Sequence, residues 1–338
     1  MQDNAQGLHG HFKFCEYREI GTLHIERGKT CEDFTCCGEH PETGVTAVVL
    51  SDGAGSCAHA QAGSEVTARA ALDYVLAQDF DELYRMSRED FGAGLLGFLH
   101  AELMCAADQL GTELMELSST LLLAVMAPDG RYLWFHVGDG LIAACSAESG
   151  CWILSQYFHV IASNFTTFVT VPGTEFDYGR GDGGIDGFLL TSDGPENYLA
   201  ENGELTSHGS LILETGFLYT PDRMVQELQG VTSLFKRQGM YDDCSFTLLC
   251  DRSRALDMYY GMDPAVRRKL FSSLECTSGR SADRMILLFD AMRLRPDGMA
   301  LPELTRLLHT HKDSRTRSKL APLVENGILM QIGSRYYF

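Results

Sequence analysis

The sequence predicts an α+β fold, in which a central antiparallel β-sandwich is flanked by helices and followed by a small C-terminal module. Two observations predict it. Short apolar segments separated by turn residues dominate the first 254 residues and are interrupted by only a few long helical patterns. The balance of charge then reverses, because residues 255–338 hold 13 Lys and Arg against 9 Asp and Glu, a net of +4 in a chain of −19. Residues 1–254 therefore carry −23.

Apolar segments bounded by turn residues predict the strands. Residues 46–50, 187–192 and 244–250 are β-like runs. Residues 118–146 hold three further apolar segments separated by Asp129-Gly130 and Asp139-Gly140, and this turn chemistry predicts a β-meander. The Asp-Gly pair at Asp52-Gly53 ends the first run and predicts a reversal of the chain there.

Helical periodicity occurs at three places in the first 254 residues. Residues 63–77 place apolar side chains at helical spacing, and residues 90–110 do so after several glycines. Residues 221–238 begin with proline, which is favoured in the first turn of a helix. We expect these helices to cover the sheets.

The C-terminal part predicts a separate module. Residues 1–254 form the predicted first domain, 255–277 a connector and 278–338 a winged-helix-like module. Within that module, residues 282–293, 301–309 and 314–326 are predicted helices and residues 327–338 a hairpin.

The third predicted helix of the module is basic, with Lys312, Arg315, Arg317 and Lys319 in or beside it. A basic helix of this kind can contact DNA phosphates. The alternative is that the helix is solvated or docks on the acidic first domain, and the sequence favours this second interpretation.

Composition limits the classes of function. A charge of −19 argues against a general nucleic-acid-binding protein, since phosphates would be repelled, but it suits divalent cations. The 11 cysteines include no CxxC pair, which is typical of a reducing compartment rather than of a disulfide framework. The first residues lack the pattern of a signal peptide and no apolar run approaches about 18 residues. We therefore expect a cytoplasmic protein with no membrane partner.

Acidic residues stand where strands begin or end. Asp52, Asp139 and Asp193 each follow an apolar run, Asp242 precedes one, and Glu32-Asp33 precedes another. Carboxylates at several strand ends can meet at one edge of a sandwich, where their oxygens suit Mg²⁺ or Mn²⁺. The alternative for each is an ordinary turn, as we expect for Asp129, Asp182 and Asp297.

Five segments in order then resemble one family. They are GTLHIERGKTCEDF, VVLSDGAGSCAHAQAGSEVTARAAL, SSTLLLAVMAPDGRYLWFHVGDG, GFLLTSDGPENYL and YDDCSFTLL. This set resembles the metal-dependent, type 2C serine/threonine phosphatases, and more narrowly the bacterial branch with an Asp-Gly-Ala-Gly-Ser motif. The similarity covers roughly residues 20–250.

The resemblance implies a ligand set for two Mn²⁺ or Mg²⁺ ions, with a looser site for a third. By similarity, Asp52 bridges the two metals and the carbonyl of Gly53 is a backbone ligand. The remaining metal ligands implied are Glu32, Asp193, Asp242 and, for the third ion, Asp139. Asp33 is implied to hold metal-bound water, and hydrolysis would proceed by metal-bound hydroxide without a phosphoenzyme.

Two positions leave alternatives open. The family's phosphate-binding arginine falls near Arg27 and Lys29, and either could serve. The Asp242-Asp243 pair offers two acids, of which the alignment favours Asp242.

Ala54 occupies the position at which many animal members have a histidine offered as general acid, so the proton donor is undefined. His24 lies within reach of the site, with a structural role favoured.

The function implied is hydrolysis of phosphoserine or phosphothreonine in proteins. The implied partner is a phosphorylated protein, either a bacterial serine/threonine kinase or its target. A non-catalytic phosphatase-like scaffold is one alternative, and a DNA-binding regulator acting through the C-terminal module is another.

Overall fold

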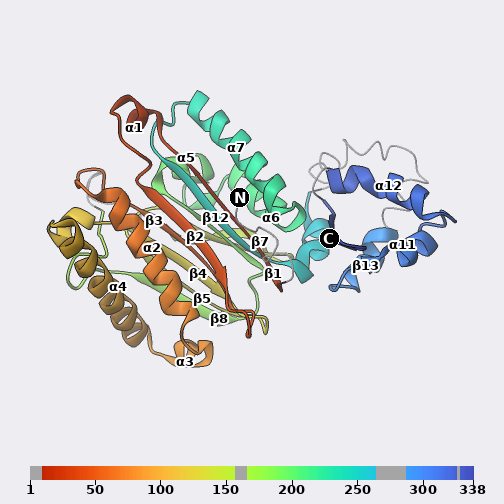
Figure 1. The fold of residues 1–338 in the computed structure, drawn as a ribbon, viewed down its shortest axis with the longest axis horizontal. Helices are drawn as coiled ribbons and strands as arrows, with labels where there is room; N and C mark the ends of the chain where they lie inside the picture. Colours follow the sequence, from red (N-terminus) through yellow and green to blue (C-terminus); the bar gives the residue numbers. More distant parts are fainter. Residues whose placement is uncertain (1–9, 157–165, 264–286, 326–327) are drawn as a thin grey trace.

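The computed structural model describes residues 10–156, 166–263, 287–325 and 328–338. Two antiparallel five-stranded sheets stack face to face, with helices outside each sheet (Figure 1). The first sheet contains, in spatial order, β1 (Phe12–Glu19), β12 (Cys244–Asp251), β9 (Gly187–Thr191), β6 (Leu141–Ser146) and β7 (Gly150–Gln156). The second contains β2 (Asp33–Glu39), β3 (Thr46–Asp52), β4 (Leu121–Met126), β5 (Arg131–Val137) and β8 (Asp177–Asp182). The predicted sandwich is confirmed.

Successive side chains of β4 point to opposite faces of its sheet, and both faces are covered, which explains why this central strand is a continuous apolar run. Leu121, Leu123 and Val125 pack in the core beneath the helices, whereas Leu122 and Ala124 pack between the sheets. Every residue of β4 is buried, because one face is covered by helices and the other by the second sheet. The strand therefore has no polar face.

Helices cover both outer faces. On the second sheet lie α2 (Ala60–Leu76) and α4 (Arg88–Leu110), which pack against each other, with α3 (Phe80–Arg85) beside them. On the first sheet lie α5 (Asp193–Leu199), α6 (Ser207–Leu218) and α7 (Pro221–Arg237). The three helices predicted before residue 254 are confirmed as α2, α4 and α7. Short elements complete the domain: α1 (Thr22–Glu26), the 3₁₀ turn η2 (Leu114–Leu117), β10 (Ala200–Glu201) and β11 (Glu204–Leu205).

The predicted meander is wrong in its second half. The turn at Asp129-Gly130 joins β4 to β5 as a hairpin, as expected. The chain then passes from the second sheet to the first at Asp139, because β6 pairs with β7 and β9 rather than with β5. Gly138 and Gly140 have φ of +96° and +94°, a backbone conformation that lets the chain cross between the sheets.

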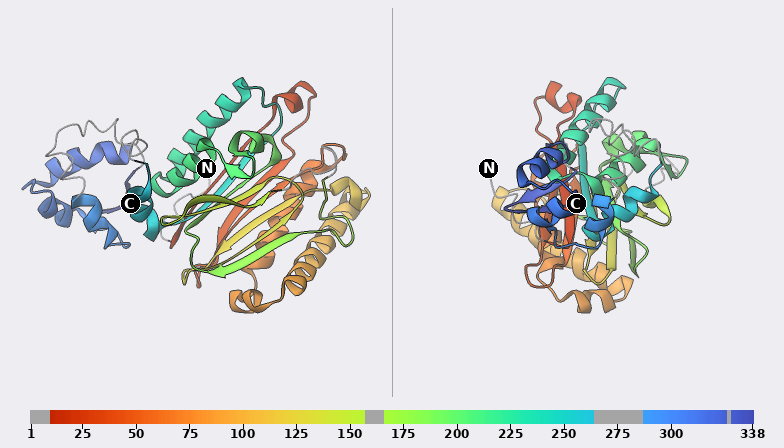
Figure 2. Two further views of the ribbon diagram at one scale, coloured as in Figure 1. Left: turned by 180° about the vertical axis from the view of Figure 1, so that it is seen from behind. Right: turned by 90° about the vertical axis from the view of Figure 1, so that its right-hand side faces the viewer.

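The C-terminal module lies at one end of the molecule (Figure 2). After the 3₁₀ turn η3 (Arg252–Arg254) and α8 (Ala255–Gly261), residues 287–293 are helical. There follow β13 (Met299–Ala300), α11 (Leu301–Leu307), α12 (Asp313–Glu325), β14 (Met330–Ile332) and β15 (Arg335–Tyr337), with the small sheet ordered β13-β15-β14. Residues 264–286, which hold part of the predicted connector and the start of the 282–293 helix, lie outside the described residues.

The described part of the predicted connector belongs to the module's core. Leu256 of α8 is buried together with Leu288, Leu304, Leu320 and other apolar side chains of the module. The Tyr259 ring contacts Phe289 edge-on at 5.5 Å between centroids. The order of helices and strands agrees with the predicted winged-helix outline, but the domain boundaries and that assignment stay predictions.

Candidate active site

Antiparallel pairing places the first two acids side by side. Asp33 begins β2 and Asp52 ends β3, and the two residues are direct partners in the ladder. Gly53 does not reverse the chain, contrary to the expected turn. Its N–H donates to the carbonyl of Glu32 at 3.1 Å, and it forms an isolated bridge to Ser119 on the strand side opposite β2. The acids therefore stand at the end of a sheet with their backbone paired.

Gly53 is required because neighbouring backbone lies against it. A Cβ atom at residue 53 would lie 2.4 Å from the carbonyl oxygen of Ala60, at the start of α2, and 2.9 Å from that of Glu32. Distances below 3.0 Å force the backbone to move. Glycine thus keeps the β3 end, the Glu32 segment and α2 in contact.

Two further acids come from the first sheet. Asp193 follows β9 and begins α5, with Ser192 at its N-cap position. Asp242 precedes β12, the neighbour of β9. A Cβ atom at Gly194 would lie 2.0 Å from the Asp243 carbonyl oxygen, so these two strand ends also touch through their backbones. Both sheets thus contribute acids to the same end of the sandwich.

Asp139 is held at the crossover between the sheets. The Nε2 atom of His136 lies 3.0 Å from the Asp139 carbonyl oxygen, and its Nδ1 lies 2.8 Å from Ser155 Oγ. Ser155 in turn donates to Asp177 at 2.9 Å. The hydroxyl of Thr166 donates to the Asp139 carboxylate. These contacts fix the backbone that carries the acid expected to hold a third ion.

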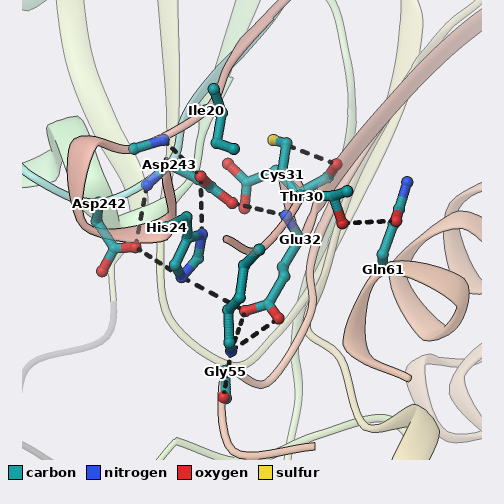
Figure 3. A network of polar contacts seen from close by, with 12 residues as sticks. Ile20, His24, Thr30, Cys31, Glu32, Gly55, Gln61, Asp242 and Asp243 are labelled. Atoms are coloured by element: carbon teal, nitrogen blue, oxygen red, sulfur yellow. Dashed lines mark hydrogen bonds and ion pairs between the residues drawn. The ribbon is translucent and has the colours of Figure 1, made fainter. Parts of the chain in front are cut away.

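Asp243 anchors the loop that carries Glu32 (Figure 3). Its carboxylate accepts the N–H of Gly21 at 2.7 Å and that of Glu32 at 2.6 Å, and lies 3.0 Å from His24 Nδ1. Asp242 is more exposed, and its carboxylate accepts only the Asp243 N–H among the described donors. This geometry agrees with the preference for Asp242 as the ligand and gives Asp243 a positioning role that the sequence did not reveal.

His24 lies between Glu32 and Asp242, two candidate ligands from separate segments. The ring is buried, with Nε2 3.5 Å from Glu32 Oε2 and 3.9 Å from Asp242 Oδ1 (Figure 3). With Nδ1 beside the Asp243 carboxylate, the other ring nitrogen faces the candidate ligands. A histidine held in this way fixes the orientation of neighbouring carboxylates.

Lys29 and Arg27 occupy different surroundings. The Lys29 Nζ lies 2.9 Å from Glu32 Oε1 and donates to the Gly55 carbonyl at 2.8 Å, beside the candidate ligand Glu32. Arg27 is exposed at the C-terminal end of α1. The structure thus brings Lys29 to the acids, whereas Arg27 points into solvent.

Ala54 is buried and its N–H donates to the Ser118 carbonyl at 2.9 Å.

The carboxylates repel one another strongly. Burial raises the pKa of Asp52 well above its usual value, and the charges of Asp33, Asp193, Asp139 and Asp242 raise it further. Burial, followed by the carboxylates of Asp139, Asp242 and Asp33, also raises the pKa of Asp193. These contributions show that acids from five separate segments lie within electrostatic range of each other.

Asp33 is the most enclosed of these acids, with no exposed surface. Burial and, after it, the charge of the Asp243 carboxylate raise the pKa of Asp33 to about 7. The hydroxyls of Ser192 and Ser245 lie near enough to lower the pKa in part, but neither Asp33 oxygen has a well-aligned donor among the described residues. Buried carboxylate oxygens in this state suit a cation or its bound water.

The donor set fits Mg²⁺ or Mn²⁺, which prefer oxygen ligands. In the described ranges, no group of three or more acidic, histidine or cysteine side chains forms a cage that could hold a metal ion. Mg²⁺ commonly keeps several waters and uses only one or two carboxylates, so a complete cage is not required. Asp52, Asp139, Asp193 and Asp242 are all partly exposed, which leaves them open to an ion from solvent.

Comparisons with known proteins agree with this architecture. A crystal structure described as a bacterial serine phosphatase superposes with a TM-score of 0.53 at 15% identity, covering 71% of this chain and 98% of that chain. The S. agalactiae serine/threonine phosphatase superposes with a TM-score of 0.51 at 17% identity, covering 71% of this chain and 99% of the other. At these identities the likeness establishes the fold. No curated protein matches the sequence.

The family match identifies the chain. The family described as protein phosphatase 2C matches residues 20–231, well over half of the sequence. The chain therefore belongs to the protein phosphatase 2C family and is a protein serine/threonine phosphatase. No helix in the described ranges is both long and apolar enough to cross a membrane. The predicted cytoplasmic location stays a prediction.

Proposed function

We propose that this chain hydrolyses phosphoserine and phosphothreonine in proteins at a dinuclear Mn²⁺ or Mg²⁺ site formed by the acidic end of the sandwich. The observation that carries the proposal is the convergence of acids from both sheets around Asp52, whose pKa is raised by burial and by four neighbouring carboxylates. A cluster with so many mutually repelling acids is stable in its charged form only when cations neutralise it.

The ligand roles follow from position. Asp52 lies centrally and would bridge two ions, with the Gly53 carbonyl beside it. The outer ligands proposed are Glu32 on one side, Asp193 and Asp242 on the other, and Asp139 for a third ion. When bound, the ions would activate a water molecule and neutralise charge on the phosphoryl oxygens.

The remaining residues orient these ligands and the substrate. Asp33, enclosed behind Asp52, would accept a hydrogen bond from a water of the site and keep it in place. Lys29, whose ammonium already lies within the cluster, is better placed than Arg27 to attract the phosphate of the substrate. His24 and Asp243 would hold Glu32 and Asp242 in position.

The substrate class is a phosphorylated protein, and a bacterial serine/threonine kinase or one of its targets remains the proposed partner. The relatives with superposable folds are described as serine or serine/threonine phosphatases, which supports this class. The presence of every expected acid in the chain, four of them within electrostatic range of Asp52, supports the enzyme over the non-catalytic scaffold.

The test is hydrolysis of p-nitrophenyl phosphate and of a phosphothreonine peptide with Mn²⁺, Mg²⁺ or chelator. Wild type is compared with Asp52→Asn, Asp193→Asn and the exposed-turn control Asp129→Asn. We expect metal-dependent turnover that both site variants reduce by at least about a hundredfold and that the control retains. A folded wild type without turnover in either metal would refute the proposal and favour the scaffold.

A further inference from the structure

The helix pair α11–α12 of the C-terminal module is joined by a rigid turn. The hydroxyl of Thr305 donates to Asp313 Oδ1 at 2.8 Å and lies 2.8 Å from that of Thr316, which lies 2.5 Å from that of Thr310. His309 and His311 in the turn have φ of +48° and +60°. Left-handed backbone at residues other than glycine is costly and persists only where surrounding contacts enforce it. The orientation of α12 relative to α11 is therefore fixed.

The outer surface of α12 carries basic side chains. Thr316, Leu320 and Leu323 form its buried side. Arg315 and Arg317 are exposed, as is Lys312 just before the helix. Within the described residues, no carboxylate lies within 4.0 Å of these three cationic groups, whereas Arg69, Arg131, Arg223 and Arg254 of the first domain are all paired.

The sequence favoured a helix that is either solvated or docked on the acidic first domain, and the exposed residues of α12 agree with the first of these two possibilities. Among the described elements, α12 packs chiefly against α11 and contributes to the module's own core. The module lies at one end of the molecule, where α11 and α12 extend beyond the sandwich (Figure 1). The basic surface of α12 is accordingly directed at solvent.

The chemistry of the surface favours one kind of partner. Among the described residues of α12, no large apolar side chain is exposed, so the surface lacks the anchor typical of a protein–protein interface. Ser314 and Ser318 lie beside the two arginines on its exposed side. Hydroxyl and guanidinium donors on the second helix of a helix-turn-helix suit phosphates and the base edges of a major groove.

We propose that Lys312, Arg315 and Arg317 on the α11–α12 surface bind duplex DNA, as a property additional to the phosphatase activity. The first domain carries −23, which opposes approach of a polyanion. Binding must therefore depend on local contacts of the module and must weaken steeply as salt rises.

The test uses the full chain and a labelled DNA duplex of mixed sequence, about 25 base pairs long, in fluorescence anisotropy titrations at several salt concentrations. Wild type is compared with the double variant Arg315→Gln/Arg317→Gln. The matched control is Arg85→Gln/Arg237→Gln, which removes two exposed arginines of the first domain. Thermal melts and phosphatase assays show whether each variant remains folded.

We expect wild type and the control to bind at low salt, and the Arg315/Arg317 variant to bind at least about tenfold more weakly. The slope of log affinity against log salt should fall by about one for each phosphate that the variant no longer neutralises. Absence of binding by wild type, or equal binding by the Arg315/Arg317 variant, would overturn the proposal. Arginine-dependent binding of polyglutamate without binding of DNA would also overturn it and would indicate an acidic protein as the partner.

Discussion

The acidic end of the sandwich and the basic surface of α12 are both charged regions, but they differ in burial. Around Asp52, carboxylates from both sheets are crowded and partly shielded from water, so each raises the pKa of its neighbours. On α12, Arg315 and Arg317 are exposed and separated, with no ion-pair partner among the described residues. Without a counter-ion, the charges of the first region lower the stability of the folded state, whereas those of the second region have almost no effect on it.

This difference in burial distinguishes a site for small metal ions from a surface for a large polyanion. Enclosed oxygen ligands strengthen electrostatic interactions and select a desolvated cation. Exposed guanidinium groups act at a higher dielectric constant and are screened by salt. Each one therefore adds little binding free energy, and several are needed for measurable affinity. Variants of the first region should therefore alter catalysis strongly, and variants of the second should not.

Gly53→Ala should have the largest effect, because the added methyl group meets the Ala60 carbonyl at the end of β3. We expect loss of measurable turnover and a decrease of about 1–3 kcal/mol in the free energy of unfolding. Gly97→Ala on α4 is the matched control, since nothing lies within 4 Å of the new methyl group. It should keep full activity and gain about 0.5–1 kcal/mol. Retained activity in Gly53→Ala would show that the β3 end does not shape the site.

Asp243→Asn should weaken metal binding without removing a ligand. The change removes the charge that orients His24 and leaves one amide nitrogen facing a backbone N–H of Gly21 or Glu32. We expect the Mn²⁺ concentration for half-maximal activity to rise about 10–100-fold, with a smaller change in turnover at saturating metal. His24→Gln should show the same pattern, and His100→Gln on α4 should resemble wild type. Loss of turnover that excess Mn²⁺ does not restore would assign Asp243 a direct role.

Lys29→Gln should have an intermediate effect on substrate binding. Its ammonium lies in the acid cluster, and its removal takes away a positive charge available to a phosphate. We expect KM for the phosphopeptide to rise about tenfold, while Arg27→Gln changes KM by less than about twofold. The reverse outcome would transfer the phosphate-binding role to Arg27.

Arg315→Gln/Arg317→Gln should have the smallest effect on catalysis. Both side chains are exposed on α12, in a module that lies at one end of the molecule. We expect kcat and KM for p-nitrophenyl phosphate to stay within about twofold of wild type. A larger change would mean that the module and the acid cluster are coupled, and the separation of the two regions would be incorrect.

The sequence predicts the strand ends at which the candidate acids lie, because that signal is local. An apolar run followed by an acid marks the end of a buried strand, as at Asp52 and Asp193, and the family resemblance extends this to Glu32 and Asp242. Asp139, between two glycines, was selected from the same local signal, but its position at the crossover between the sheets was not predicted. An Asp-Gly pair indicates a turn equally well whether the chain stays in one sheet or crosses to another.

Features that depend on distant residues could not be predicted. The contact of His24 with Asp243 joins residues far apart in the chain, and so does that of His136 with Ser155. Helix α6 was missed because most of its residues are buried, so it lacks the one-sided apolar pattern on which helix prediction relies. Its seven buried residues pack among α5, α7 and the first sheet.

The pH dependence of the metal-free protein follows from the same crowding. Burial raises the pKa of Asp33 to about 7, above the value of about 4 expected for an unfolded chain. A raised carboxyl pKa means that the folded state holds its proton longer. Its stabilising contribution is therefore present below about pH 4 and is lost as the pH rises through about 7. In chelator, the wild type should thus lose stability between about pH 4 and pH 7.

The most direct test of the account is the thermal unfolding of wild type and Asp52→Asn at about pH 8, in chelator and in Mn²⁺. Removing the central charge relieves repulsion, so Asp52→Asn should unfold at a higher temperature than wild type in chelator. With Mn²⁺ the order should reverse, because only the wild type gains the free energy of binding the ions. A wild type that is the more stable protein in chelator, or that Mn²⁺ does not stabilise, would contradict the claim that this acidic end is built for cations.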